Sequence, residues 1–426
     1  MGVAHATTDT GPGTSATTRN RLPLLALLAA NTVSEIGSSL TLIALPWFVL
    51  ATTGSAAQTG LTGFSVALPG FLVGIFGGTL VDRLGYRRSS VIADVVSGVG
   101  VGLVPTLFRT VGLPFPLLLG LVFLGSMLAI PGLTARRSML PELAGLAGVR
   151  LERTNAAFES IQQLAFLLGP PLAGLLIVWL GPTTVLWIDA ASFAFSAVVV
   201  GLVVPAFRAA HESASPEGYL TQLRAGLHFL LHEPLLRAMA IALGLFNGLQ
   251  GPAFAVVLPV YARTVLGGPE ALGFLASAVG AGALAGAASY GVVGHRLSRR
   301  TIWYVSYLLS PFAYWVLAGR LPLPVLLATY ALFGLVMGPV NPMMVTIRHE
   351  RIPAEMRGRV FATYSAISQL AQPLGILVVG FAIAGVGLRP TVIVLGGTIL
   401  AAALGMFAVP ALRHMDDPPE PARPAS

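Results

Sequence analysis

The sequence contains no cysteine and no lysine, and it is poor in charge of either sign. The absence of cysteine excludes disulfides, thiolate metal sites and cysteine nucleophiles. Charged residues make up only 10% of the 426 residues, whereas a soluble domain carries about 25%. A chain with so few charges cannot cover its surface with polar groups. Together with 55% hydrophobic residues and a mean hydropathy of +0.81, this predicts a protein whose solvent is lipid.

Common signatures of catalysis are also missing. The sequence has no Gly-x-Ser-x-Gly motif, and without lysine it cannot form a Gly-Lys-Ser/Thr phosphate-binding loop. We therefore expect neither an enzyme nor a pump driven directly by ATP, and we expect no cofactor.

Twelve apolar runs are each near the ~20 residues that a bilayer requires. Their backbone must be helical, because lipid offers no hydrogen-bond partners. We therefore predict an all-α integral membrane protein with twelve transmembrane helices, six in residues 21–205 and six in residues 238–412. The runs lie at about 22–50, 57–81, 89–109, 115–135, 155–179, 183–205, 238–264, 271–293, 301–319, 322–345, 360–385 and 390–411.

Three segments lie outside these two halves. Residues 1–20 and 413–426 have the composition of disordered tails. The linker, residues 206–237, has leucines at helical spacing, with Arg224, His228 and His232 between them. This pattern predicts an amphipathic helix on the membrane surface. The two histidines could bind a ligand, but a solvated helix face explains them more simply.

The arginines predict the orientation in the membrane. If both tails are cytoplasmic, only Arg109, Arg263, Arg320 and Arg389 lie outside, and the other 21 of 25 basic residues lie inside. Positively charged residues favour cytoplasmic loops, so this placement explains the net charge of +8 without a nucleic-acid partner. We expect a bacterial cytoplasmic membrane protein with both termini in the cytoplasm.

A short charged turn at residues 77–88, Gly-Gly-Thr-Leu-Val-Asp-Arg-Leu-Gly-Tyr-Arg-Arg, separates the second and third apolar runs. A degraded copy follows 213 positions later, with His295 in place of Asp82 and Ser298 in place of Gly85. A second repeat relates residues 153–175 to 359–381 at an offset of 206. Each repeat occupies the corresponding place in its own half, so the two six-helix halves are pseudo-symmetric, as in many secondary transporters.

The turn resembles the signature of the major facilitator superfamily, Gly-x-Leu-x-Asp-Arg-x-Gly-x-Arg-Arg. The residues that fit it are Gly78, Leu80, Asp82, Arg83, Gly85, Arg87 and Arg88, and the resemblance covers about residues 20–412. It implies two halves that rock about a central site. It also implies that Asp82 pairs with the other half and closes a cytoplasmic gate.

Four acids lie inside the apolar runs, where an ionisable group is costly and suggests a function. Glu35 is the deepest and is our first candidate for coupling proton flow to transport; a hydrogen-bonded structural acid is the alternative. Asp189 is the second candidate. We expect Asp94 to pair with the arginines of the turn, and Glu159 to brace the gate with Arg136, Arg137 or Arg153.

Two further patterns favour export over import. Gly169, Pro170 and Gly174 resemble part of a motif of drug/proton antiporters in this superfamily, although packing of small residues at a kink explains much of it. Residues 136–143, Arg-Arg-Ser-Met-Leu-Pro-Glu-Leu, and Arg357-Gly358-Arg359 resemble the subgroup of macrolide and siderophore exporters.

In this family the first, fourth, seventh and tenth helices line the cavity. The candidates for substrate contacts there are Asn31, Glu35, Met127, Phe246, Asn247, Gln250, Asn341, Met343 and Met344. Methionine, phenylalanine and a few amides suit amphipathic organic molecules, although each methionine or phenylalanine could equally serve helix packing.

These observations predict a monomeric secondary transporter that exports a small amphipathic compound, such as a drug or siderophore, by proton antiport. Two alternatives remain open. One is a proton-coupled symporter for uptake, and the other is a membrane receptor or scaffold that transports nothing.

Overall fold

A computed structural model describes residues 20–207 and 219–417, apart from the side chains at 71, 73–83, 219–220, 222–223 and 295. Most of the two expected tails lies outside the described residues. The described part of the chain is helical and contains no β-strand, as predicted.

The first half, called the N bundle here, is built from the six runs before the linker. Its fourth run is split into two helices, and a short helix precedes the fifth. The helices are α1 (Leu22–Thr53), α2 (Ala56–Leu84), α3 (Tyr86–Thr110), α4 (Phe115–Met127), α5 (Ala129–Ser138), α6 (Leu140–Ala147), α7 (Leu151–Leu180) and α8 (Pro182–Val203).

The second half, the C bundle, follows the linker helix α9 (Tyr219–His232) and is more broken. Its elements are α10 (Pro234–Gln250), η1 (Ala253–Val257), α11 (Leu258–Tyr261), η2 (Ala262–Leu266), α12 (Pro269–Val293), η3 (Gly294–Arg296), α13 (Arg299–Leu309), α14 (Phe312–Trp315), η4 (Val316–Ala318), α15 (Leu323–Met337), α16 (Val340–Arg351), η5 (Ala354–Met356), α17 (Arg357–Gln369), α18 (Ala371–Val386), α19 (Leu388–Gly405), η6 (Met406–Ala408) and η7 (Pro410–His414).

Ten helical segments of the described chain are long and apolar enough to cross a membrane. The two remaining expected spans, 57–81 and 301–319, coincide with α2 and with the consecutive short elements α13, α14 and η4. The all-α membrane fold is therefore as predicted, and the helices agree with the count of twelve spans.

Glycine and proline explain where several helices stop. The charged turn between α2 and α3 is shorter than expected, because α2 continues to Leu84 and only Gly85 separates the helices. Gly85 has a φ of +79°, which is accessible to glycine at little cost. In the seventh span, α10 ends before Gly251-Pro252 and two π-helical turns, η1 and η2, follow.

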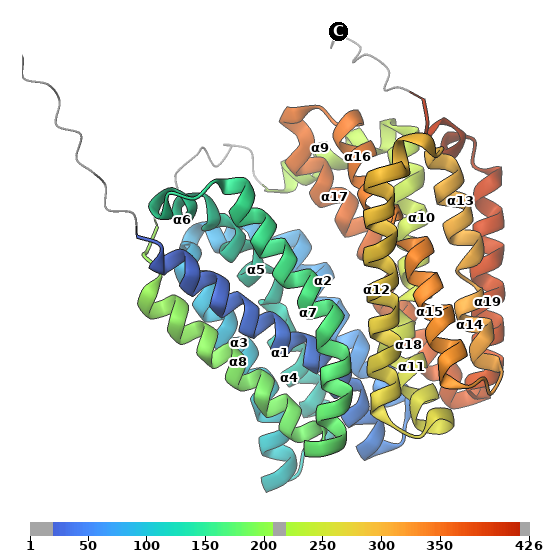
Figure 1. The fold of residues 1–426 in the computed structure, drawn as a ribbon, viewed down its shortest axis with the longest axis horizontal. Helices are drawn as coiled ribbons and strands as arrows, with labels where there is room; N and C mark the ends of the chain where they lie inside the picture. Colours follow the sequence, from blue (N-terminus) through green and yellow to red (C-terminus); the bar gives the residue numbers. More distant parts are fainter. Residues whose placement is uncertain (1–19, 208–218, 418–426) are drawn as a thin grey trace, which may run out of the picture.

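The described chain begins and ends at the same end of the molecule, called the terminal end here; the opposite end is called the far end (Figure 1). The backbone N–H of Asn20 donates to the carbonyl of Leu146, which lies in the last turn of α6. Arg351, the last residue of α16, donates to the carbonyl of His414. A chain that crosses the membrane an even number of times must begin and end on the same side of it, as this one does.

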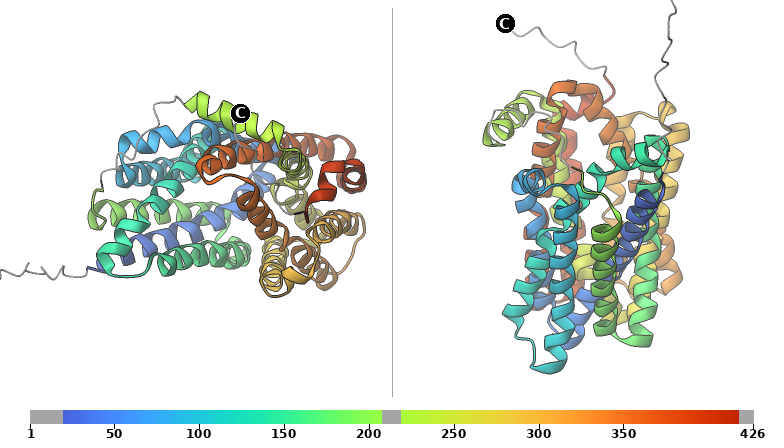
Figure 2. Two further views of the ribbon diagram at one scale, coloured as in Figure 1. Left: turned by 90° about the horizontal axis from the view of Figure 1, so that it is seen from above. Right: turned by 90° about the vertical axis from the view of Figure 1, so that its left-hand side faces the viewer.

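The two bundles touch at the far end and diverge towards the terminal end, as two views show (Figures 1 and 2). One buried apolar cluster runs from residues 40–50 of α1 into the C bundle, whereas the terminal end of the N bundle has its own cluster around Leu27, Leu143 and Phe158. Among the described side chains, burial of apolar surface therefore joins the bundles at the far end and not at the terminal end.

Small residues allow the bundles to approach closely at the far end. A Cβ on Gly60 of α2 would lie 2.9 Å from the Cα of Gly380 of α18, and a Cβ on Gly174 of α7 would lie 2.8 Å from the Cα of Glu270 of α12. Towards the middle, the hydroxyl of Ser277 donates to the carbonyl of Leu167 at 2.8 Å. The α2–α18 and α7–α12 pairs are therefore the main contacts between the bundles.

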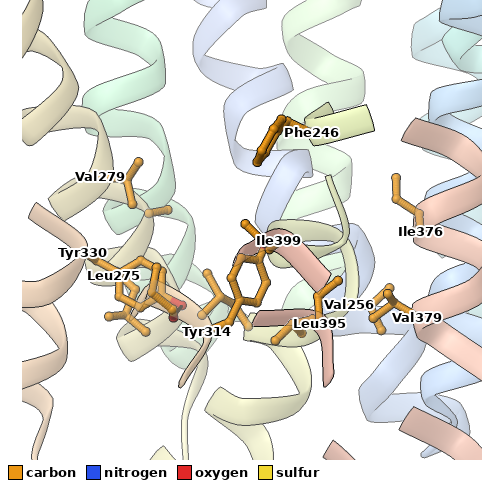
Figure 3. Close-up of a cluster of buried hydrophobic side chains, with 14 of the residues drawn as sticks. Phe246, Val256, Leu275, Val279, Tyr314, Tyr330, Ile376, Val379, Leu395 and Ile399 are labelled. Atoms are coloured by element: carbon orange, nitrogen blue, oxygen red, sulfur yellow. Dashed lines mark hydrogen bonds between the residues drawn. The ribbon is translucent and has the colours of Figure 1, made fainter. Parts of the chain in front are cut away.

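The core of the C bundle is built by many short elements. Figure 3 shows aromatic and branched side chains from α10, η1, α12, α14, α15, α18 and α19 gathered in one cluster. Tyr314 and Tyr330 are fully buried there, and their hydroxyls donate to backbone carbonyls. These bonds satisfy the polar groups that burial would otherwise leave unpaired.

The predicted amphipathic helix is present as α9 and packs against α17. Leu230 is buried, and Gly226 lies against the backbone of Arg359. Leu227 and Leu231 stay exposed. The side chains of Leu220 and Leu223 lie outside the described residues.

Candidate functional site

Arg136 of α5 is the centre of a buried polar network in the N bundle. Its side chain is 5% exposed and forms an ion pair with Asp94 of α3, which is 2% exposed. The guanidinium also donates to Asn31 and Ser34 of α1, Ser90 of α3 and Ser196 of α8. The guanidinium of Arg136 therefore joins its own helix, α5, to three other helices, α1, α3 and α8.

This network corrects two expectations. Arg136 was expected in a cytoplasmic loop, but α5 continues to Ser138 and carries it into the bundle. Asp94 was expected to pair with the arginines of the turn, but it pairs with Arg136 and accepts a second bond from Ser196 at 2.7 Å. A buried charge needs an opposite charge and further hydrogen bonds, and Arg136 satisfies both needs of Asp94.

A second polar chain lies beside the first and links three helices. Arg137 of α5 forms an ion pair with Glu159 of α7 at 2.9 Å and donates to Gln162 at 2.9 Å. Gln162 in turn lies close enough to Glu35 of α1 to act on its carboxyl group. Of the three partners proposed for Glu159, the structure shows Arg137.

Glu35 is half-buried, and no ion pair joins it to any residue that the structure describes. Arg136 and Arg137 are close enough to act on it electrostatically. Gln162 lies five residues nearer the terminal end of α7 than Leu167, which contacts the C bundle. Glu35 therefore lies where the two bundles begin to diverge.

Asp189 of α8 is 1% exposed and has only neutral partners among the described residues. The hydroxyl of Thr41 donates to it at 2.5 Å and that of Ser192 at 3.2 Å. Gly37 of α1 leaves the space for this site, since a Cβ there would overlap Ser192. Asp189 belongs to the α1–α8 contact inside the N bundle, away from the chain of Glu35.

The antiporter-like residues lie at helix contacts. A Cβ on Gly169 would overlap Ser39 of α1, and the carbonyl of Pro170 lies against Gly273 of α12 in the other bundle. Gly174 touches Glu270, also across the bundles. The pattern thus brings α7 close to α1 on one side and to the C bundle on the other.

The signature turn is described only in part. The side chains of Leu80, Asp82 and Arg83 and the surroundings of Gly78 lie outside what the structure describes, so the gate proposed for Asp82 stays a prediction. Arg87 donates to the carbonyl of Val204 at 3.2 Å, and Arg88 is exposed.

The second copy of the turn is held by the C-terminal segment. Asp416 accepts hydrogen bonds from the backbone N–H of Arg299 and the hydroxyl of Ser298, both at 2.6 Å. Arg299 also forms a two-bond ion pair with Glu350 of α16, at 2.6 and 2.8 Å. The copy has lost the acid of the signature, and Asp416 supplies a carboxylate beside it from elsewhere in the chain.

The substrate candidates divide into two groups. Asn31, Phe246, Met343 and Met344 are buried inside their own bundles; Phe246, for example, packs on Tyr307 with ring centroids 4.1 Å apart. The half-buried or exposed candidates are Glu35, Met127, Asn247, Gln250 and Asn341. Only the second group keeps surface for a substrate in this conformation.

Metal-binding clusters, the histidines of α9 and a pocket at the far end were the other candidate places for a ligand. No group of three or more histidine or acidic side chains in the described residues could hold a metal ion. His228 and His232, four positions apart, lie on the exposed face of α9 with their ring centroids 4.1 Å apart. A pocket of about 620 Å³ lies between the bundles at the far end, beside Leu50 and Arg263.

Comparison with known proteins agrees with this architecture. The family model described as Major Facilitator Superfamily matches residues 27–310 and 243–426. The multidrug efflux pump Tap of Mycobacterium tuberculosis is 34% identical over 405 residues, which covers 94% of this chain and 96% of that protein. The enterobactin exporter EntS of Escherichia coli is 28% identical and covers 83% of this chain and 84% of that protein. The crystal structure of the nucleoside transporter NupG superposes with a TM-score of 0.76 at 13% identity, covering 91% of this chain and 98% of that one.

Proposed function

Because the chain belongs to the Major Facilitator Superfamily, we propose that it exports small amphipathic organic compounds from a bacterial cell in exchange for protons. The predicted resemblance to drug and siderophore exporters is confirmed by the similarity to Tap and EntS. The substrate class, the coupling ion and the cytoplasmic placement of the terminal end are our proposals.

The position of Glu35 carries the proposal of proton coupling. It is an acid without an ion pair among the described residues, and it lies on α1 near Gln162, which is five residues nearer the terminal end of α7 than the contact of Leu167 with the C bundle. Gln162 connects it to the Arg137–Glu159 pair. When the terminal end is open, water can reach Glu35 through this polar chain. When the bundles close there, contact with that water is lost.

Coupling requires that the proton and the substrate prefer different states. A ligand shifts a conformational equilibrium only by its differential affinity for the two states. A protonated Glu35 is neutral and tolerates an apolar surrounding, whereas the charged form is penalised by desolvation. We propose that protonation favours closure around Glu35, and that a bound substrate favours the opposite movement. Asp189 is a second candidate for carrying a proton, since it has only hydroxyl partners.

The helix breaks support rocking of the bundles. The fourth span breaks between α4 and α5, the seventh at Gly251-Pro252 and the tenth at Gly338-Pro339. Breaks and π-helical turns mark places where a helix can bend. These are three of the four spans expected to line the cavity, so each could bend as the bundles rock.

Transport by purified protein in proteoliposomes tests the proposal. With an imposed pH gradient, the unaltered protein should accumulate a fluorescent cation such as ethidium on the acidic side. Glu35→Gln should abolish accumulation but keep passive exchange of the dye, because glutamine preserves the side-chain size and removes the proton site. Full accumulation by Glu35→Gln would remove Glu35 from the mechanism. Absence of any dye movement by the unaltered protein, across a panel of amphipathic compounds, would contradict export itself.

A further inference from the structure

Two arginines occupy corresponding places in the two bundles and have opposite surroundings. Arg136 lies five residues before Pro141, and Arg348 of α16 lies five residues before Pro353. Arg136 is neutralised by Asp94. By the offset of 213 that relates the two turns, the residue corresponding to Asp94 is Tyr307, which cannot supply a carboxylate.

Arg348 therefore has no partner of opposite charge in the part of the chain that the structure describes. Of the residues that the structure describes, none forms an ion pair with it. Its one hydrogen bond to a described residue runs from Nε to the carbonyl of Met344 at 3.2 Å. The two terminal nitrogens, Nη1 and Nη2, make no hydrogen bond to a described residue, and neither is fully buried. Both can therefore be reached from outside the protein. These two nitrogens form one edge of the planar fork that binds a carboxylate through two parallel bonds.

Aromatic rings of α17 hold the guanidinium in place. Its central carbon lies 4.8 Å from the ring centroid of Tyr364 and 5.3 Å from that of Phe361. Cation–π contacts of this kind fix the plane of an arginine. A fixed plane loses less entropy when a ligand binds.

The hydroxyl of Tyr364 is a second unsatisfied group at the same place. Tyr364 is 1% exposed, and its hydroxyl has no hydrogen-bond partner among the residues that the structure describes. It lies within electrostatic range of Arg348. A buried hydroxyl without a partner is costly, and an acceptor atom bound by Arg348 could remove that cost.

We propose that Arg348 and Tyr364 form a binding subsite for the carboxylate of an amphipathic aromatic substrate. The elements that carry them, α16 and α17, lie at the terminal end on the side of the C bundle that faces the N bundle (Figures 1 and 2). A substrate entering from that end would meet Arg348 with its acid group, and its apolar part could reach deeper between the bundles. The inference rests on the proposed export function for its biological meaning, but binding can be measured separately.

Rhodamine B and its ethyl ester make a matched pair, because they differ only in whether the carboxylate is free. Binding of each dye to the purified protein in detergent is measured by fluorescence anisotropy. The unaltered protein should bind the acid more tightly than the ester. Arg348→Gln should raise the Kd of the acid about tenfold or more, as expected for loss of a hydrogen bond to a charged group, and leave the ester within about twofold.

Tyr364→Phe distinguishes binding from packing, since it keeps the ring under the guanidinium and removes only the hydroxyl. It should raise the Kd of the acid by roughly two- to tenfold. Arg357→Gln is the control. Arg357 donates to the carbonyls of Ile352 and His349, so this substitution removes the same charge nearby. It should leave the preference for the acid over the ester unchanged. If Arg348→Gln does not fold, Arg348→Lys and Tyr364→Phe carry the test.

Two outcomes would overturn the subsite: no preference for the acid in the unaltered protein, or equal weakening of acid and ester by the substitutions. An equal loss would mean that Arg348 serves packing or pairs with a carboxylate of the N bundle. A preference for the acid without transport of either dye would leave the subsite standing and count against the proposed function.

Discussion

Removing Arg136 should be among the most destabilising single changes in the N bundle. Arg136→Met would leave Asp94, which is 2% exposed, with only the hydroxyl of Ser196. Breaking a buried ion pair by removing one partner costs about 3–5 kcal/mol, because the remaining charge stays buried and uncompensated. Asn31, Ser34 and Ser90 would each lose a bond to the same group. We therefore expect a loss near the upper end of that range.

A neighbouring arginine provides the control. Arg137 is 48% exposed and pairs with Glu159, which is 53% exposed. Such a pair contributes about 0–1 kcal/mol, so Arg137→Met should change stability little. Adding Asp94→Asn to Arg136→Met should restore most of the lost stability, because it removes the stranded charge.

Reversible unfolding in mixed micelles with increasing SDS measures the free energy of unfolding of all four proteins. The order expected is unaltered, Arg137→Met, the double variant, then Arg136→Met. If Arg136→Met costs no more than Arg137→Met, the buried network does not stabilise the bundle. If the double variant is as unstable as Arg136→Met, the stranded charge is not the cause.

Two other perturbations test the contacts at the two ends. Gly273→Ala places a Cβ on the carbonyl of Pro170 in the other bundle, which should cost about 1–3 kcal/mol and shift spin-label distances across the far end towards separation. Gly291→Ala on the same helix has nothing within 4 Å and should leave the distances unchanged; equal shifts would show that the α7–α12 contact does not hold the far end closed. Asp416→Ala removes the carboxylate at the start of α13 and should lower the free energy of unfolding by about 1 kcal/mol. Asp417→Ala, which loses only an exposed contact with His414, should have little effect, and equal losses would argue against capping of α13 by Asp416.

The fold could be predicted to a large extent because lipid imposes strong rules. Long apolar runs must become helices, and two repeats at nearly equal offsets imply two similar halves. The arginine at the end of the fourth run shows the limit of that reasoning. In the sequence, Arg136 and Arg137 are adjacent and look alike, yet one is buried at 5% exposure and the other is half-exposed. A helix turns by about 100° per residue, so neighbours point in different directions, and only packing decides which one faces the bundle.

The candidate site could be predicted by residue type but not by partner. Glu35, Asp94, Glu159 and Asp189 stand out because acids are rare inside apolar runs, and all four have polar neighbours in the structure. The partner of Asp94 was assigned wrongly, because proximity along the chain favoured the arginines of the turn. A signal for the true partner was present in the small polar residues on three other runs, which all accept hydrogen bonds from the Arg136 guanidinium: Asn31, Ser34, Ser90 and Ser196.

The sequence by itself determined that this chain lies in a membrane, that it is helical and duplicated, and to which superfamily it belongs. These properties depend on composition, on the lengths of apolar runs and on local motifs, all of which can be read along one dimension. The tertiary structure decided which bundle ends touch and which acid meets which arginine. It also decided that Arg348 has no carboxylate partner among the described residues, whereas its counterpart Arg136 has one. Those properties depend on which faces of distant helices meet, and close packing settles that only once all the helices are in place.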